Sequence, residues 1–198
     1  MDKIICVYGS SSSSIDKKYF EAAAGLGRAM ALKGDTLLFG GGMTGLMGAT
    51  AKGIHESSGK VIGVIPKALN VKGIVYEYCD ELIVTEGLRE RKAVMDRRSD
   101  AFIALPGGYG TLEEVLEIIT LKQLKYHNKP VVILNVDGFY DQLIKMFASI
   151  IDERFAKPEC REFYFVTPQI TEALDYIDSY TPHTFGDKWF TDVDAPSR

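Results

Sequence analysis

Short, nearly continuous runs of apolar residues alternate with longer amphipathic stretches along this chain. Unbroken runs of Val, Ile and Leu are typical of strands buried on both faces, and amphipathic stretches are typical of the helices that cover them. The pattern predicts an α/β fold: a single Rossmann-like, doubly wound domain whose parallel sheet is flanked by helices. The predicted strands are residues 3–8, 36–39, 60–65, 81–85, 101–105, 130–134 and 162–166, and the predicted helices are residues 16–33, 44–58, 87–99, 111–125, 139–154 and 168–178.

Length and composition agree with one globular domain. The chain has 198 residues, of which 46% are hydrophobic and 25% charged. We assign residues 1–180 to the domain and residues 181–198 to a C-terminal tail, because the tail shows no periodicity. The net charge of −4 and the lack of a basic run argue against a nucleic-acid partner.

The cysteines and the chain ends bear on location. Cys6, Cys79 and Cys160 are odd in number and far apart, which indicates neither a disulfide framework nor a zinc site. No apolar stretch is long enough to span a membrane, and the N-terminus opens into a strand pattern with no signal peptide before it. The three histidines show no metal-ligand spacing. We therefore expect a cytoplasmic protein that has no membrane contact and binds no metal.

The loop after the strand at 101–105 carries the strongest ligand signal. Ligands of doubly wound sheets bind at the carboxyl ends of the strands. Here Pro106 is followed by Gly107, Gly108 and Gly110, whose amides can surround an anion without Cβ obstruction. Thr111 is expected to cap the following helix, which predicts a phosphate-binding loop at a helix N-terminus.

Glu114, three residues after Thr111, has two interpretations. It completes a capping-box pattern, which is a purely structural role. Alternatively it is functional, because it shares its side of the helix with Ile118 and Leu121. The stripe of Leu112, Val115, Leu116 and Ile119 is expected to face the sheet, so this second apolar side suggests a subunit interface beside the phosphate loop.

Two earlier loops also follow strands. In the loop at 9–14, Gly9 and Ser10 begin a serine run that suits a phosphate, and a flexible turn with a serine N-cap is an equally open alternative. Gly41, Gly42 and Gly45 belong to a formal G-x-G-x-x-G match. No acidic residue ends the next strand to bind a ribose, so this loop favours a mononucleotide over a dinucleotide, the alternative being a tight turn.

An arginine-rich segment covers residues 87–98. Leu88, Arg91 and Met95 fall on one helix face, where Arg91 either lays its stem on apolar neighbours or presents its guanidinium to a ligand. From spacing alone the first alternative is favoured.

Together these motifs resemble the Lonely Guy family of cytokinin riboside 5′-monophosphate phosphoribohydrolases. The family signature P-G-G-x-G-T-x-x-E is matched from Pro106 to Glu114, and the family's Arg-Lys pair is matched by Arg91 and Lys92. The resemblance extends over residues 3–180. One departure is that Leu88 and Arg89 stand where the family often has Met-His, which affects substrate preference more than the reaction.

The resemblance implies a homodimer or an assembly of dimers that splits the N-glycosidic bond of an N6-substituted AMP. Glu114 and Arg91 would be catalytic, the glycines and Thr111 would hold the 5′-phosphate, and Leu88, Lys92 and Met95 would help to bind the substrate. Some members are described as lysine decarboxylases, but nothing here resembles a pyridoxal-phosphate lysine site, and no cofactor is expected. The alternative function is a nucleotide or molybdenum-cofactor carrier or sensor on the same fold, which would keep the glycines without requiring Arg91 and Glu114 together.

Overall fold

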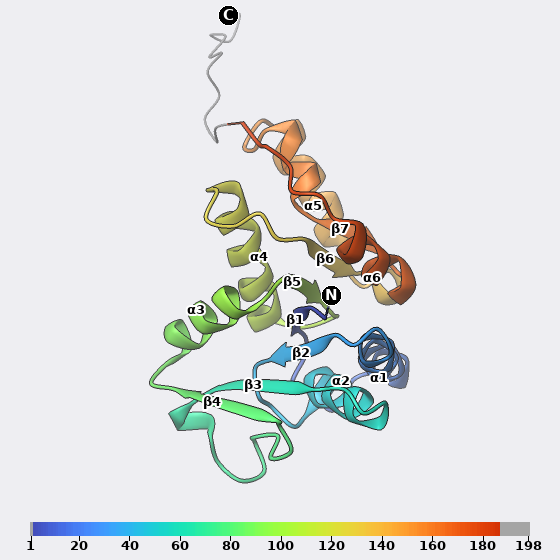
Figure 1. Ribbon diagram of the computed structural model, residues 1–198. Helices are drawn as coiled ribbons and strands as arrows, with labels where there is room; N and C mark the ends of the chain where they lie inside the picture. Colours follow the sequence, from blue (N-terminus) through green and yellow to red (C-terminus); the bar gives the residue numbers. More distant parts are fainter. Residues whose placement is uncertain (1, 187–198) are drawn as a thin grey trace, which may run out of the picture.

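The computed structural model describes residues 2–186 and contains one seven-stranded sheet (Figure 1). Every paired strand runs parallel to its neighbours, in the order β4-β3-β2-β1-β5-β6-β7. This confirms the predicted doubly wound α/β fold. The strands are β1 (Ile4–Tyr8), β2 (Thr36–Phe39), β3 (Val61–Pro66), β4 (Glu81–Thr85), β5 (Ala101–Ala104), β6 (Val131–Leu134) and β7 (Phe165–Thr167).

Helices cover both faces of the sheet. In Figure 1, α1, α2 and α6 lie to the right of the sheet, and α3 and α4 lie to its left. Ile5 and Val7 of β1 pack with α1, α2 and α6, whereas Cys6 and Tyr8 pack with α3 and α4, so β1 is buried on both faces as its apolar run predicts. The helices are α1 (Lys17–Leu32), α2 (Gly45–Glu56), α3 (Leu88–Arg98), α4 (Tyr109–Gln123), α5 (Asp141–Asp152) and α6 (Ile170–Ser179).

Most boundaries agree with the predicted ones to within about two residues. Gly34 has a φ of +83° just beyond the C-cap of α1, a conformation that suits glycine at a helix end. Pro66 is the last residue of β3, opposite Thr85 of β4. The last strand was placed too early, because residues 158–163 form a 3-10 helix and β7 begins at Phe165.

The orientation predicted for α4 is correct only in part. Val115, assigned to the sheet side, is 1% exposed and packs on the sheet, but Ile118, assigned to the subunit-interface side, is 3% exposed and packs there as well. Leu116, assigned to the sheet, is 39% exposed. A helix that is apolar on two sides can satisfy its periodicity in either orientation, and packing selects one.

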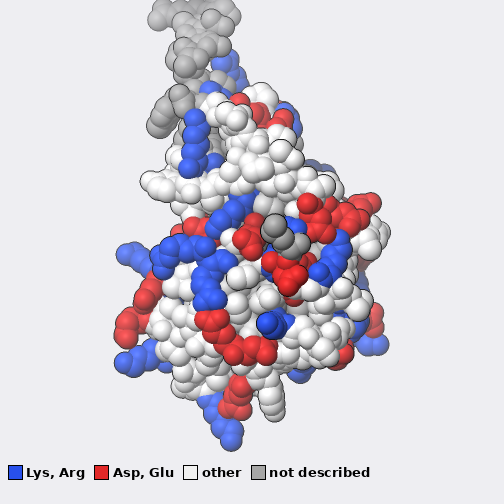
Figure 2. Space-filling view, viewed as in Figure 1, with Lys and Arg blue, Asp and Glu red and all other residues white. Residues whose placement is uncertain are grey.

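The described part of the tail lies against the end of α4. Phe185 packs edge-on against Phe163, and the Asn128 side-chain amide, just beyond α4, donates a hydrogen bond to the His183 carbonyl. Residues 187–198 of the predicted tail lie outside the described residues. Among the helices that are described, none is long and apolar enough to cross a membrane. On the face seen in Figure 2, basic and acidic side chains are interspersed.

The contact between α1 and α2 depends on two glycines that allow close backbone approach. A Cβ on Gly53 of α2 would lie 2.3 Å from the carbonyl oxygen of Ala24, and one on Gly27 of α1 would lie 2.3 Å from that of Thr50. Backbone atoms cannot move aside at these points without separating the helices.

Gly53→Ala should therefore lower the free energy of unfolding by about 1–3 kcal/mol through overpacking, despite the better helix propensity of Ala. Urea denaturation measures this change. The matched control is Gly25→Ala in α1, whose Cβ meets only the Ile170 side-chain end, at 3.3 Å. A Gly53→Ala protein at least as stable as the Gly25→Ala protein would contradict the prediction.

Candidate active site

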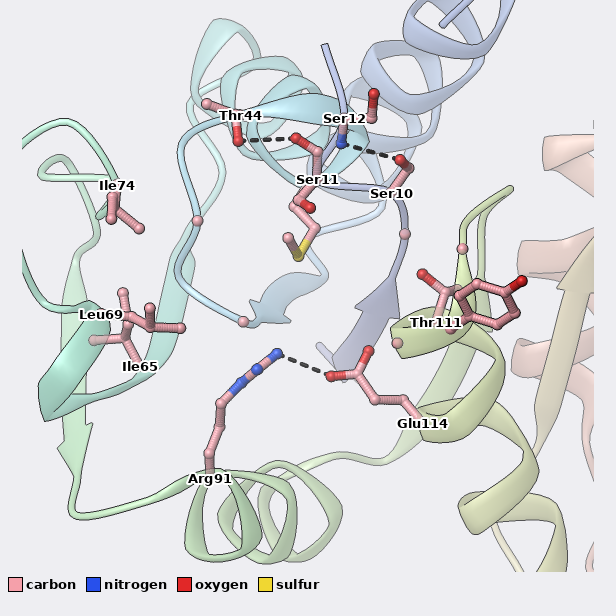
Figure 3. A pocket seen from close by; sticks show the side chains of 17 residues that line it. Ser10, Ser11, Ser12, Thr44, Ile65, Leu69, Ile74, Arg91, Thr111 and Glu114 are labelled. Carbon is pink, nitrogen blue, oxygen red and sulfur yellow. Dashed lines mark hydrogen bonds and ion pairs between the residues drawn. The ribbon is translucent and has the colours of Figure 1, made fainter. Parts of the chain in front are cut away.

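A cavity of about 710 Å³ opens at the carboxyl ends of the strands, at the position the fold class predicts (Figure 3). It lies where the order of the sheet reverses, with β2 on one side of β1 and β5 on the other. Four loops and the first turns of α3 and α4 contribute to it. Its lining residues are Gly9, Ser10, Ser11, Ser12, Gly40, Gly42, Thr44, Met47, Ile65, Leu69, Ile74, Arg91, Gly108, Tyr109, Gly110, Thr111 and Glu114.

A nearly buried ion pair lies in this cavity. Arg91 of α3 and Glu114 of α4 point toward each other, and Arg91 Nη2 donates a hydrogen bond to Glu114 Oε1 at 2.9 Å (Figure 3). Each side chain is 12% exposed. Of the two alternatives for Arg91, the structure thus places its guanidinium toward the cavity and not in bulk water.

The surroundings compensate the burial of the Glu114 carboxylate and of the Arg91 guanidinium only in part. Burial raises the pKa of Glu114 above its usual range, and the neighbouring Arg91 charge opposes that rise only in part. Arg91 Nε is buried and has no hydrogen-bond partner among the described residues. A carboxylate with a raised pKa beside a cation in a cleft is the kind of group that functional sites use for proton transfer or charge stabilisation.

The loop after β5 delivers free amides to the cavity. The helix α4 starts at Tyr109 with Gly108 as its N-cap, and no side chain caps it. The first N–H groups of a helix lack helical acceptors, so those at this end are available to an anion. A Cβ on Gly108 or Gly110 would meet none of the described residues within 4 Å, so the backbone at both positions borders open space.

The predicted capping role of Thr111 is wrong. Thr111 is the third residue of α4 and is 4% exposed, so it lies inside the first turn and not before it. The capping-box alternative for Glu114 fails for the same reason. Gly107 makes room for this threonine, because a Cβ there would lie 2.1 Å from Thr111 Oγ1.

The serine loop is an ordered part of the site. Ser10 N donates to the Pro106 carbonyl, and the Ser10 carbonyl accepts from Leu46 N at 2.8 Å. Ser10 thereby connects the loops after β1, β2 and β5. The N-cap of α1 is Asp16 and not a serine, which contradicts the alternative of a turn with a serine cap.

The glycine loop after β2 divides into two groups. Gly42 lines the cavity, whereas Gly41 and Gly45 do not. Gly41 and Gly45 have φ values of +73° and +63°, and a Cβ on Gly45 would lie 2.2 Å from Ser10 O. These two glycines therefore shape the turn and allow the serine loop to approach.

Some residues expected at the site lie elsewhere. Lys92 pairs with Glu113 and Glu117 of α4, outside the cavity lining. Met95 is fully buried in the core, and Leu88 is 57% exposed. Gly107 borders a separate, smaller cavity. Among the described residues, no group of three His, Cys, Asp or Glu side chains is arranged to hold a metal ion.

Sequence reasoning missed an apolar wall of the cavity. Ile65, Leu69 and Ile74 line it together with Met47. The segment after β3 is held there by backbone pairing with the glycine loop, since Met43 N donates to Ile74 O at 2.8 Å. The signal that could have indicated this wall was the presence of apolar residues, among them Leu69 and Ile74, between the predicted strands at 60–65 and 81–85.

Removing the Arg91 charge should raise the pKa of Glu114 further, because the carboxylate loses the cation that partly offsets its burial. We expect this in Arg91→Met, followed by NMR titration of the Glu114 side-chain carbon. Arg89→Met removes an exposed arginine from the same helix and is the control. An unchanged or lower Glu114 pKa in Arg91→Met would contradict the electrostatic account.

Comparison with known proteins places this geometry in context. Residues 47–177 match the family described as "Possible lysine decarboxylase". The chain is 43% identical over 180 residues to cytokinin riboside 5′-monophosphate phosphoribohydrolase LOG5 of Arabidopsis thaliana, covering 91% of this chain and 79% of that protein. It is 43% identical over 178 residues to the probable cytokinin riboside 5′-monophosphate phosphoribohydrolase LOGL6 of Oryza sativa subsp. japonica, covering 90% and 71%.

Solved structures share the fold at lower identity. The molybdenum cofactor binding protein from Rippkaea orientalis has a TM-score of 0.71 at 26% identity, over 90% of this chain and 97% of that one. The molybdenum cofactor carrier protein from Chlamydomonas reinhardtii has a TM-score of 0.69 at 27% identity, with the same coverage.

Proposed function

This chain belongs to the Lonely Guy family of cytokinin riboside 5′-monophosphate phosphoribohydrolases, and we propose that it hydrolyses the N-glycosidic bond of AMP or N6-substituted AMP. The products are the free base and ribose 5-phosphate. The observation that carries this proposal is the Arg91–Glu114 pair, nearly buried in the cavity whose rim includes the start of α4. A nucleotide carrier would not require Arg91 and Glu114 together, because it binds its ligand without cleaving a bond.

The cavity suits the two ends of such a substrate. The amides at Gly108, Gly110 and Thr111 would bind the 5′-phosphate, with Gly9 and Ser10 beside them in the neighbouring loop, where Ser10 N donates to the Pro106 carbonyl. The apolar wall that includes Ile65, Leu69 and Ile74 would accept the base and its N6 substituent. Gly41, Gly45 and Gly107 would act by shaping the loops. Leu88, Lys92 and Met95 would act through the placement of α3.

Glu114 would perform the central step. Breaking the bond from C1′ to the base nitrogen leaves positive charge on the ribose, as in glycoside hydrolysis. A carboxylate beside C1′ stabilises that charge and accepts a proton from the attacking water, whose hydroxyl bonds to C1′. The departing base takes up a proton, so that the reaction as a whole adds the OH of water to C1′ and a proton to the base. Arg91 would hold Glu114 and the sugar oxygens electrostatically, because a guanidinium is a poor proton donor.

A molybdenum-cofactor carrier is the second candidate, favoured by the structural similarity to such proteins. It would bind its ligand at the same glycine loops without bond cleavage. A lysine decarboxylase has less support from the site: the described residues that line the cavity include no lysine to hold pyridoxal phosphate.

The direct test is to incubate the protein with AMP and with N6-prenylated AMP and to separate the products by chromatography. We expect free base from at least one of them. Glu114→Gln should lower kcat about 10²–10⁴-fold, the usual contribution of a positioned acid or base, while folding is retained. Glu117→Gln alters an exposed glutamate one turn further along α4 and is the matched control.

Release of base at the wild-type rate by Glu114→Gln would contradict the role of Glu114. Tight AMP binding by the wild-type protein without base release from either nucleotide would favour the carrier.

We further propose that the chain acts as a cytoplasmic homodimer. Its three cysteines are free thiols, in keeping with a reducing compartment. Leu116 and Ile119 of α4 and Phe147 of α5 line an apolar groove of about 190 Å³. A second copy would cover this surface. Sedimentation should show a dimer that Leu116→Glu weakens; a monomeric wild-type protein at micromolar concentration would contradict the proposal.

A further inference from the structure

Gly40 lies at the carboxyl end of β2 and is buried in contact with the Arg91 guanidinium. A Cβ at this position would lie 2.2 Å from Arg91 Nη2, 3.0 Å from Cζ and 3.4 Å from Nε. All three nearest atoms belong to one guanidinium. Gly40 is not among the positive-φ glycines, so its backbone suits any residue and the constraint is purely steric.

The kind of atom that a Cβ would meet distinguishes Gly40 from the glycines at the start of α2. A Cβ on Gly45 would lie 2.2 Å from Ser10 O, and one on Gly48 would lie 2.0 Å from Met43 O; both are backbone atoms. Backbone cannot yield there without disrupting the turn. At Gly40 the obstacle is the far end of a flexible side chain, so an added methyl group displaces Arg91 and leaves the fold intact.

Displacement of this guanidinium has a definite consequence. Arg91 Nη2 holds Glu114 Oε1 at 2.9 Å, and both side chains are 12% exposed. A shift large enough to clear a 2.2 Å contact breaks that hydrogen bond. A misplacement of about 1 Å in a catalytic group costs on the order of 10² in rate.

We propose that Gly40 is a positioning residue whose missing side chain seats the Arg91 guanidinium against Glu114. The kinetic part of this inference rests on the proposed hydrolysis. The seating itself rests on the contact distances alone. Although Gly40 also lines the cavity, its effect on the reaction is exerted through Arg91.

The test is Gly40→Ala, with Gly87→Ala as the matched control. Gly87 immediately precedes α3, which carries Arg91, and a Cβ there would meet nothing within 4 Å. We expect Gly40→Ala to lower kcat by about 10²-fold with an unchanged thermal unfolding midpoint. Gly87→Ala should keep the wild-type kcat.

Two further readouts separate positioning from a direct or structural role. In an Arg91→Ala background, Gly40→Ala should cause no additional loss of kcat, because the group it displaces is already absent. In the wild-type background it should raise the pKa of Glu114, which Arg91 otherwise lowers. The acidic limb of the kcat/KM profile would then move to higher pH, since the active carboxylate becomes protonated earlier as pH falls.

Three outcomes would overturn the inference: wild-type kcat in Gly40→Ala, an equal loss of kcat with and without Arg91, or unfolding of Gly40→Ala. If the wild-type protein releases no base, the proposed hydrolysis fails instead. NMR titration of Glu114 in Gly40→Ala and Gly87→Ala then decides the seating by itself, because an unchanged Glu114 pKa in Gly40→Ala would refute it.

Discussion

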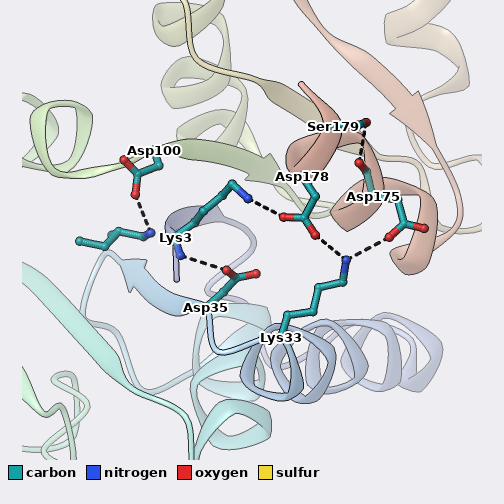
Figure 4. A network of polar contacts seen from close by, with 8 residues as sticks. Lys3, Lys33, Asp35, Asp100, Asp175, Asp178 and Ser179 are labelled. Atoms are coloured by element: carbon teal, nitrogen blue, oxygen red, sulfur yellow. Dashed lines mark hydrogen bonds and ion pairs between the residues drawn. The ribbon is translucent and has the colours of Figure 1, made fainter. Parts of the chain in front are cut away.

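The site depends on β1 lying between β2 and β5 in a parallel sheet. The crossover from β1 leads to β2 on one side of β1, and the crossover from β4 leads to β5 on its other side. The loops that follow β1, β2 and β5 therefore meet at one edge of the sheet. The amino end of β1 is fixed by a polar network at the opposite edge (Figure 4). There Lys3 N donates a hydrogen bond to the Asp35 carboxylate, and Ile4 N donates one to Asp100. Lys3 also pairs with Asp178 of α6. The strand that organises the cavity is therefore anchored far from it.

Burial gives the Arg91–Glu114 pair its properties. Removing a carboxylate from water disfavours its charged form, and one nearby cation recovers only part of that cost. The result is a glutamate that is paired but whose pKa remains raised. Its partner Arg91 retains a buried Nε that has no acceptor within residues 2–186. Such a pair can still interact electrostatically with a substrate whose charge changes during bond cleavage.

Glycine serves three physical purposes around this cavity. At Gly45 and Gly48 it allows backbone to meet backbone, which the turn requires. At Gly108 and Gly110 none of the described residues occupies the space that a Cβ would fill, so the backbone there borders open space. At Gly40 the space holds a charged side chain from another helix. One residue type in two short motifs thus shapes the loops, exposes the phosphate site and seats the arginine.

The sequence by itself determined the fold class, most of the element boundaries and the loops that meet at the cavity. These follow from local periodicity, and the carboxyl-edge rule for parallel sheets converts them into a place for the ligand. Only the tertiary structure decided how each helix is rotated. Because α4 is apolar on two sides, packing of Val115 and Ile118 on the sheet had to select its orientation, which put Glu114 opposite Arg91. The orientation of α3 likewise placed Met95 in the core and Lys92 outside the cavity. It also brought Arg91 into contact with Gly40, and no local pattern encodes a contact between residues so far apart in the sequence.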